Sequence, residues 1–247
     1  WSNGDPVKAS DFLFSFKRIL SPALAAEYAY MLYCIDNAEG YHKSQIKDFS
    51  MVGVKAPDDT TLIIKLGKPT PYFLSLIMHH SWFPVHPPTI LKYGNIDTRG
   101  TKWTRAENFV GNGQFTLASW HINKIITVRK NEYYWDAANV SLKEINFYPI
   151  ENNLTEERAF RTGQLHITSG LPPQKIDWYK NNKPDELRID PYLGTYYYLI
   201  NVNRKPLDNK NLRKALSLAI NRDELTKHVT KGGQIPAGCF TPYNTAG

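Results

Sequence analysis

The sequence predicts a mixed α/β fold arranged in two lobes. Stretches with apolar residues at helical spacing alternate with short runs of β-branched and aromatic residues. The chain has 247 residues, longer than a usual domain of ~100–150 residues, and no stretch has the composition of a long linker. Its 42% hydrophobic content can fill one large core or two modest ones. We therefore expect two lobes joined by ordered crossings.

The first 80 residues are expected to be mainly helical. Phe12, Phe16, Ile19 and Leu20 recur on one face and predict an amphipathic helix that ends before Ser21-Pro22. Three further elements are predicted: a helical stretch over residues 23–34, a hairpin of residues 52–54 and 61–66 around a turn at 57–60, and a short helix over 71–78 with Thr70 as its cap.

From residue 109 the sequence favours strands. Residues 115–120 and 125–130 flank a polar turn at 121–124, and residues 143–150 alternate with Ile145, Phe147 and Pro149 on one face. A helix is expected to start at Asn153 or Thr155, to run through Arg161 and to end at Gly163, followed by a strand over 165–168.

The last third is expected to alternate between helix and extended chain. The predicted elements are a helix over 172–180, a short strand over 187–189, an extended aromatic segment over 196–202, a helix over 212–220 capped by Asp208, and a helix from Asp223 that Gly232-Gly233 ends.

Composition excludes several classes of protein. Thirty Lys and Arg against 23 Asp and Glu give a net charge of +7, but the basic residues are scattered and do not alternate with aromatics, so we expect no nucleic-acid partner. The apolar runs fall far short of the ~20 residues of a membrane span. Cys34 and Cys239 are too few for a disulfide scaffold and are expected to be two buried free thiols.

Residues that could carry chemistry favour structural roles. His79, His80 and His86 form the densest histidine group, but adjacent histidines at a helix end point in different directions, so we expect capping or pocket-wall residues and no metal. The acidic pairs suit turns and helix starts: Asp58-Asp59, Glu156-Glu157 and Asp185-Glu186. The GxSxG, GxxxxGK[ST] and HExxH signatures are absent. We therefore expect neither an enzyme nor a cofactor, with a carboxylate-pair hydrolase as the alternative.

Aromatic residues make up 13% of the chain. Tyr196, Tyr197 and Tyr198 stand in a row, and on an extended chain Tyr197 must face opposite to its neighbours. One face could pack on a core while the other lines a cleft. The alternative is that all three tyrosines lie in a core or on the surface of a sheet.

Five stretches, in order and over nearly the whole chain, resemble the extracytoplasmic solute-binding proteins of peptide ABC transporters (family 5), and among them the oligopeptide binders. The stretches are residues 1–7 with Asp11-Phe12, residues 111–115, 129–136, 190–198 and 212–222. The resemblance implies a periplasmic-binding-protein-like fold (type II, peptide/nickel-binding cluster) with two lobes and a hinge, truncated at both ends. It implies that residues 1–86 belong to the smaller lobe (domain II-like), 87–193 to the sheet-rich lobe (domain I-like), and 194–247 to the hinge crossing and the start of a third domain (domain III-like).

The resemblance also implies a ligand site. Tyr28 is expected to reach the ligand from the smaller lobe, Tyr192 and Tyr197 to line the cleft near the lobe crossing, and Ser169, Gly170 and Leu171 to form a ligand-facing strand edge. The implied protein captures oligopeptides mainly through backbone contacts and delivers them to ABC permease subunits of the inner membrane. It is expected to be monomeric, free of cofactors and metals, and either periplasmic or membrane-anchored outside the cytoplasm.

Several alternatives remain open. Relatives within this fold take up dipeptides, murein peptides, haem, glutathione or nickel, and a surface protein that binds anionic lipid or polymer is a further class. Three positions depart from the oligopeptide binders. Gly194 replaces a cysteine, Leu199 replaces an acidic residue, and Lys8 replaces a capping threonine, which leaves Ser10 as the expected start of the first helix. Since the family is roughly twice this length, we expect the chain alone to bind peptides weakly or not at all.

Overall fold

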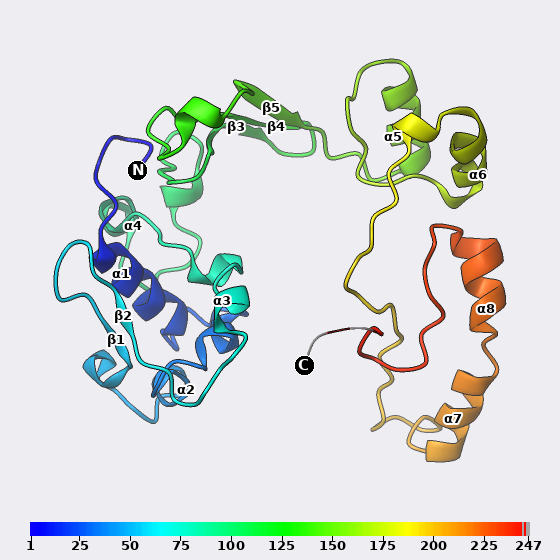
Figure 1. The fold of residues 1–247 in the computed structure, drawn as a ribbon. Helices are drawn as coiled ribbons and strands as arrows, with labels where there is room; N and C mark the ends of the chain where they lie inside the picture. Colours follow the sequence, from blue (N-terminus) through cyan, green and yellow to red (C-terminus); the bar gives the residue numbers. More distant parts are fainter. Residues whose placement is uncertain (244, 246–247) are drawn as a thin grey trace. The chain divides into compact units, whose positions relative to one another are not determined.

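The chain forms two compact units in the computed structural model, Trp1–Pro149 and Ile150–Gly247, of which the structure describes residues 1–243 and 245 (Figure 1). In the described part of the chain, no helix combines the length and the apolar character needed to cross a membrane. The expected domain boundaries after residues 86 and 193 stay predictions.

Helix α1 (Ala9–Leu20) opens the first unit and ends before Ser21, as the apolar spacing predicts. The expected start at Ser10 is wrong, because Lys8 is the N-cap residue and Asp11 supplies the acceptor. The Oδ2 atom of Asp11 accepts hydrogen bonds from the Lys8 backbone N–H and from the buried Trp1 indole N–H, each at 2.9 Å. A carboxylate in the first turn therefore ties the chain before the helix to the helix itself.

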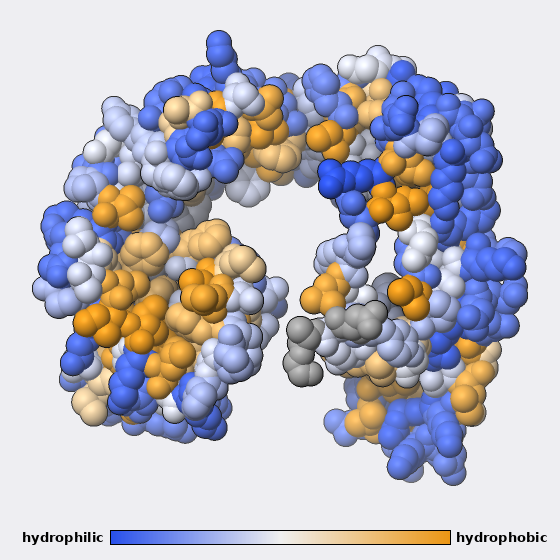
Figure 2. Space-filling view, viewed as in Figure 1, coloured by the Kyte–Doolittle hydropathy of each residue, from blue (hydrophilic) through white to orange (hydrophobic). Residues whose placement is uncertain are grey.

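The core of the first unit forms around α1. Phe16, only 1% exposed, packs edge-to-face on Trp82 with ring centroids 5.4 Å apart, and Leu20, Leu32 and Ile35 complete the buried centre. Short elements supply the rest of this region: η1 (Ala29–Leu32), α2 (Ala38–His42), η2 (Phe49–Met51), α3 (Phe73–Leu76), η3 (His80–Trp82), α4 (Pro87–Tyr93) and η4 (Lys102–Thr104). Figure 2 shows hydrophobic residues on the visible face of this unit over the region of α1 and α3.

Two helical predictions in this unit are too long. Residues 23–34 form turns and η1, because Ala25 takes a positive φ of 49° that interrupts a helix. Residues 71–78 contain only α3, with Tyr72 as N-cap, while the Thr70 hydroxyl donates to the Lys68 carbonyl instead of capping a helix. The predicted hairpin is confirmed in short form as β1 (Val54–Lys55) and β2 (Ile63–Ile64), an antiparallel pair.

The three strands expected here form, as β3 (Phe115–His121), β4 (Ile125–Lys130) and β5 (Glu144–Phe147). They pair as an antiparallel sheet in the order β3-β4-β5. A bulge lies at Ala118, because Leu117 pairs with Val128 while Ser119 pairs with Thr127. Two apolar rows therefore cross the sheet on one face. They are Leu117–Val128–Ile145 and Trp120–Ile126–Phe147. The short helix η5 (Ala137–Asn139) lies between β4 and β5.

The second unit is built from helices and irregular chain: α5 (Asn153–Arg161), α6 (Pro173–Asn182), η6 (Pro184–Glu186), α7 (Lys210–Leu218), α8 (Arg222–Glu224) and the π-helix η7 (Leu225–Thr230). Asparagine side chains cap three of them, namely Asn152 for α5, Asn209 for α7 and Asn221 for α8. The expectation that Asp208 caps the helix α7 is therefore wrong by one position. The helix expected to begin at Asp223 begins one residue earlier, at Arg222, as α8. The helix before Gly232-Gly233 ends at Thr230, as expected.

The predicted strands of the second unit do not form within the described residues. Residues 165–168 and 187–189 have no strand partner there, and Ile167 is 84% exposed. A β-branched run becomes a strand only when a neighbouring chain accepts its backbone hydrogen bonds. Residues 196–202 likewise belong to no ladder.

Candidate ligand-binding site

Tyr28 lies in the first unit, at the N-cap position of η1, and is 41% exposed. Its ring centroid is 5.0 Å from that of His79 and 5.5 Å from that of His80, and the two imidazoles are 4.1 Å apart. Tyr30 adds a fourth ring 6.0 Å from Tyr28. These four residues, the Tyr28 cluster, present ring faces and edges together with polar nitrogen and hydroxyl groups.

Of the three histidines, His79 takes the expected capping role. The Nδ1 atom of His79 accepts the Ser81 backbone N–H at 3.3 Å and caps η3. His86 lies elsewhere, buried against the Trp1 ring, with its Nε2 3.0 Å from an Asp5 carboxylate oxygen and its Nδ1 2.7 Å from the Thr89 hydroxyl. Hydrogen bonds from Asn3 and His86 lower the pKa of Asp5. Within residues 1–243 and 245, no three His, Cys, Asp or Glu side chains gather as a group that could hold a metal ion.

Ser169, Gly170 and Leu171 lie in the second unit, in the irregular chain between α5 and α6. The carboxylate of Glu156, buried on α5, accepts the Ser169 backbone N–H at 2.7 Å and the Ser169 hydroxyl at 3.0 Å. The two bonds end on different carboxylate oxygens, so they fix both the position and the orientation of this segment. Sequence reasoning assigned Glu156 to a helix start and missed this contact.

Glu157, the neighbour of Glu156, has a separate structural role. It is buried, accepts a hydrogen bond from the Tyr179 hydroxyl at 3.1 Å and pairs with Arg161 at 3.1 Å. The pKa of Tyr179 is raised mainly by burial and, to a smaller extent, by the hydrogen bond to Glu157. Each carboxylate of the pair is thus held by its own partners, which fits a packing role better than acid-base chemistry.

Tyr192 and Tyr197 are exposed in the irregular chain that follows η6, by 90% and 54% of their surface. The rings of Tyr196 and Tyr198 contact each other at 5.9 Å, whereas Tyr197 contacts Phe240 at 4.9 Å. Tyr197 therefore has a different ring partner from its two neighbours, as alternation along an extended chain requires. None of the three tyrosines is buried in the core of the described chain.

The expected site residues thus fall into two groups. Tyr28 belongs to the first unit and the other five to the second. Within the second unit, no hydrogen bond or ring contact among the described residues joins Ser169, Gly170 or Leu171 to Tyr192 or Tyr197. His80, whose ring lies against that of Tyr28, is a further candidate for contact with a ligand. The only signal for it in the sequence was its position next to His79.

The remaining candidates for chemistry have local partners. Asp58 accepts hydrogen bonds from Thr60 and Thr61 within its turn, which lower its pKa, and Asp59 pairs with Lys8 at 2.8 Å. Both cysteines are free thiols, as expected, but only Cys34 is partly buried. The expectation of a buried Cys239 is wrong, because this residue lies in the exposed chain near the C-terminal end of the described region.

Comparison with known proteins shows similarity along the whole chain. The family model described as bacterial extracellular solute-binding proteins, family 5 Middle, matches residues 1–247. The periplasmic oligopeptide-binding protein OppA of Salmonella typhimurium is 36% identical over 250 residues, which cover 100% of this chain and 45% of that protein. The oligopeptide-binding protein OppA of Bacillus subtilis is 37% identical over 255 residues, covering 100% and 45%.

Solved structures show the same relationship. The murein tripeptide binding protein MppA of Escherichia coli superimposes with a TM-score of 0.93 at 32% identity, over 100% of this chain and 47% of that chain. The OppA of Haemophilus influenzae, solved with the peptide RPPGFSPFR, gives 0.90 at 38% identity, over 98% and 46%. The predicted fold class is confirmed, and the chain spans about 45% of the length of the curated relatives it matches.

Proposed function

The chain belongs to family 5 of the bacterial extracellular solute-binding proteins, and on that premise we propose that it contributes to the capture of oligopeptides for an ABC importer. Its relatives in Salmonella typhimurium and Bacillus subtilis are oligopeptide-binding proteins. A peptide held mainly through its backbone presents the same groups whatever its sequence, and each backbone hydrogen bond contributes only ~0.5–1.5 kcal/mol. Such a protein binds many peptides and needs no specific side-chain pocket.

The observation that carries this proposal is the state of the backbone at Ser169, Gly170 and Leu171. The Ser169 N–H donates its hydrogen bond to Glu156. Among the described residues, the Ser169 carbonyl accepts no hydrogen bond, the Gly170 N–H donates none and the Gly170 carbonyl accepts none. These groups can pair with the backbone of an extended ligand in the manner of an added strand. The buried carboxylate beneath them keeps the segment in place before a ligand arrives, which reduces the entropy lost on binding.

The aromatic residues supply the second part of the proposed site. Tyr28, Tyr192 and Tyr197 offer uncharged rings with hydroxyl groups. By the resemblance given above, Leu199 stands where the oligopeptide binders have an acidic residue. Rings of this kind contact diverse side chains without demanding a charge. We therefore propose a ligand preference for uncharged peptides over basic ones.

The proposal includes a cellular setting. The protein would act outside the cytoplasm, periplasmic or membrane-anchored, as a monomer that delivers its ligand to permease subunits and carries out no chemistry. It would need no cofactor. Relatives named for dipeptides and murein peptides are 35% and 33% identical, so these ligands are the alternatives that an experiment has to separate. Haem, glutathione and nickel are further ligands within the fold.

Native mass spectrometry of the protein isolated from its own cells tests the ligand class. Bound oligopeptides would give a ladder of adduct masses whose fragmentation yields peptide sequences. A single adduct mass belonging to a dipeptide, a murein peptide, haem, glutathione or nickel would overturn the oligopeptide assignment.

Substitution of the tyrosines tests the site. In that same protein, Tyr197→Ala and Tyr28→Ala should each raise the Kd for tetra-alanine about tenfold, since each removes ring surface that the bound peptide would bury, at ~25 cal/mol per Å². Tyr72→Ala is the matched control, because Tyr72 is also exposed and lies outside the site. Equal effects of all three substitutions would refute the assigned positions.

A further inference from the structure

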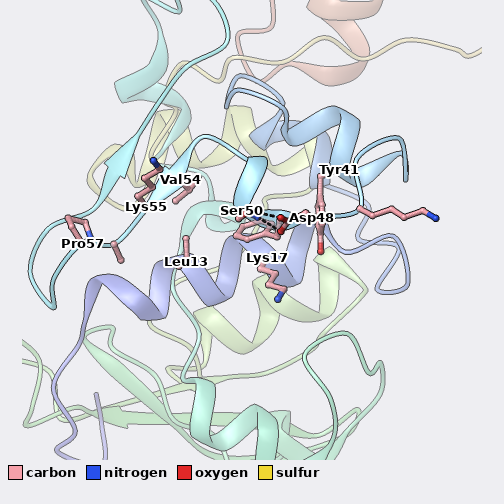
Figure 3. Close-up of a pocket in the computed structure, with 11 residues that line it drawn as sticks. Leu13, Lys17, Tyr41, Asp48, Ser50, Val54, Lys55 and Pro57 are labelled. Carbon is pink, nitrogen blue, oxygen red and sulfur yellow. Dashed lines mark hydrogen bonds between the residues drawn. The ribbon is translucent and has the colours of Figure 1, made fainter.

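A second candidate site lies in the first unit, on the side of α1 that faces η2 and β1. An open depression of about 710 Å³ is lined there by residues from α1, α2, η2 and β1 with the loops beside them (Figure 3). Its volume lies within the range of ~300–1,000 Å³ of ligand sites. None of the residues assigned to peptide binding lines it.

The apolar part of this depression is aromatic. Tyr41 and Phe49 pack edge-to-face with ring centroids 5.2 Å apart, and Leu13 and Val54 add aliphatic surface. The ammonium group of Lys17 lies 6.0 Å from the centre of the Phe49 ring. The ring and the ammonium group attract each other, so apolar surface and positive charge lie side by side in this depression.

The charged part of the depression is basic. Lys17, Lys47 and Lys55 line it, all three are exposed, and none pairs with a carboxylate among the described residues. Other lysines of this unit do have such partners, for example Lys43 with Glu39 and Lys65 with Asp36. Three ammonium groups without an ion pair among the described residues, around one hollow, are positioned to attract anions.

The acidic residues near this depression are already engaged. Asp48 is the one carboxylate among its lining residues, and it accepts hydrogen bonds from the Ser50 backbone N–H at 2.9 Å and the Ser50 hydroxyl at 2.6 Å (Figure 3). Asp58 and Asp59, which follow the lining residue Pro57, are held by Thr60 and by Lys8. Three lysines against one aspartate leave the lining with a formal charge of +2.

Exposed apolar side chains continue this surface beyond the lysines. Ile63 is the cross-strand partner of Lys55, so the two side chains share a face of the hairpin, and Ile63 is half exposed. Met51, next to the lining residue Ser50, is exposed as well. A partner at this surface would therefore contact ammonium groups and apolar side chains together.

We propose that this basic depression docks an acidic segment of a partner protein, one that carries an apolar side chain between carboxylates. The apolar side chain would enter the hollow over Tyr41 and Phe49, and the flanking carboxylates would pair with Lys17, Lys47 and Lys55. The concave form favours a protruding protein segment over a membrane, because a flat layer of lipid headgroups contacts a rim and does not fill a hollow. Charge complementarity of this kind mainly raises the rate and the specificity of association.

Cross-linking with the complete chain tests the location. The probe is the blocked peptide acetyl-Glu-Glu-Leu-Glu-Glu-amide, joined to lysines by a zero-length carbodiimide and mapped by mass spectrometry. Cross-links should concentrate on Lys17, Lys47 and Lys55. Lys92, Lys102 and Lys124 are exposed lysines of the same unit and serve as the reference. Equal labelling of both sets would overturn the proposal.

Binding measurements test the energetics. The triple variant K17S/K47S/K55S should raise the Kd for the peptide about tenfold, whereas the charge-matched variant K92S/K102S/K124S should leave it within about twofold. Thermal melting of both variants shows whether the fold is retained. An unchanged Kd in the first variant would overturn the proposal. So would lysine-dependent binding to phosphatidylglycerol vesicles without binding to the peptide, which would assign the surface to lipid.

Discussion

Glu156→Gln tests whether a buried carboxylate fixes the proposed peptide-binding edge. In the wild-type protein the two carboxylate oxygens of Glu156 accept the backbone N–H and the hydroxyl of Ser169 at 2.7 and 3.0 Å. A hydrogen bond to a charged group contributes ~1.5–3 kcal/mol and a neutral one ~0.5–1.5 kcal/mol. In glutamine the remaining oxygen accepts the Ser169 N–H as a neutral bond, while the amide nitrogen cannot accept and the Ser169 hydroxyl must turn to accept from it. The substitution should therefore cost about 2 kcal/mol in the free energy of opening this segment.

Hydrogen exchange measures this effect directly. The exchange of the Ser169 amide should accelerate about 30-fold, which is the equivalent of that free energy, while amides of α1 keep their rates. Glu151→Gln is the matched control, because Glu151 is exposed and forms no hydrogen bond among the described residues. Exchange at Ser169 within about threefold of wild type would refute the idea that Glu156 holds the edge.

Three further outcomes follow from the packing and the backbone. Phe16→Ala should lower the free energy of unfolding by ~3–5 kcal/mol in urea denaturation, because it opens a cavity beside Trp82 in the core; a loss below about 1 kcal/mol would contradict the buried position. The raised pKa of Tyr179 means that its contribution to stability is present below the ordinary pKa of 10.0 and is lost as the pH rises above it, so Tyr179→Phe should show a smaller alkaline loss than wild type in melting from pH ~9 to ~11. Gly163→Ala should cost about 1 kcal/mol from strain alone, because Gly163 has a φ of +75° and no atom within 4 Å of the added methyl; an unchanged melting temperature would show that the turn relaxes.

Local signals predicted the elements that depend on local physics. The amphipathic spacing around Phe16 gave α1, and the turn at residues 121–124 gave the β3–β4 hairpin, because helix faces and hairpin turns need few distant contacts. The caps were harder to assign. Asn209 and Asp208 both carry an oxygen that can accept a backbone N–H, and only the backbone angles decide which one lies before the first turn.

Strands in the second unit could not be predicted correctly from local pattern. Residues 165–168 have β-branched character, but a strand exists only where a second chain segment lies beside it, and the described residues supply none. The site shows the same limit. The alternation of Tyr196, Tyr197 and Tyr198 followed from chain geometry, whereas the bond from Ser169 to Glu156 joins residues 13 positions apart and became visible only in the fold.

The bulge at Ala118 has a consequence for how this sheet tolerates changes in chain length. Because Ala118 has no partner on β4, its removal leaves Leu117 opposite Val128 and Trp120 opposite Ile126. A deletion at this position would therefore straighten the ladder without moving the hairpin turn or exchanging its two faces. Elsewhere in the same strand, the loss of one residue would shift the register and move part of the strand's side chains to the opposite face of the sheet. Homologous chains should thus differ by one residue at this position more readily than at any other in β3.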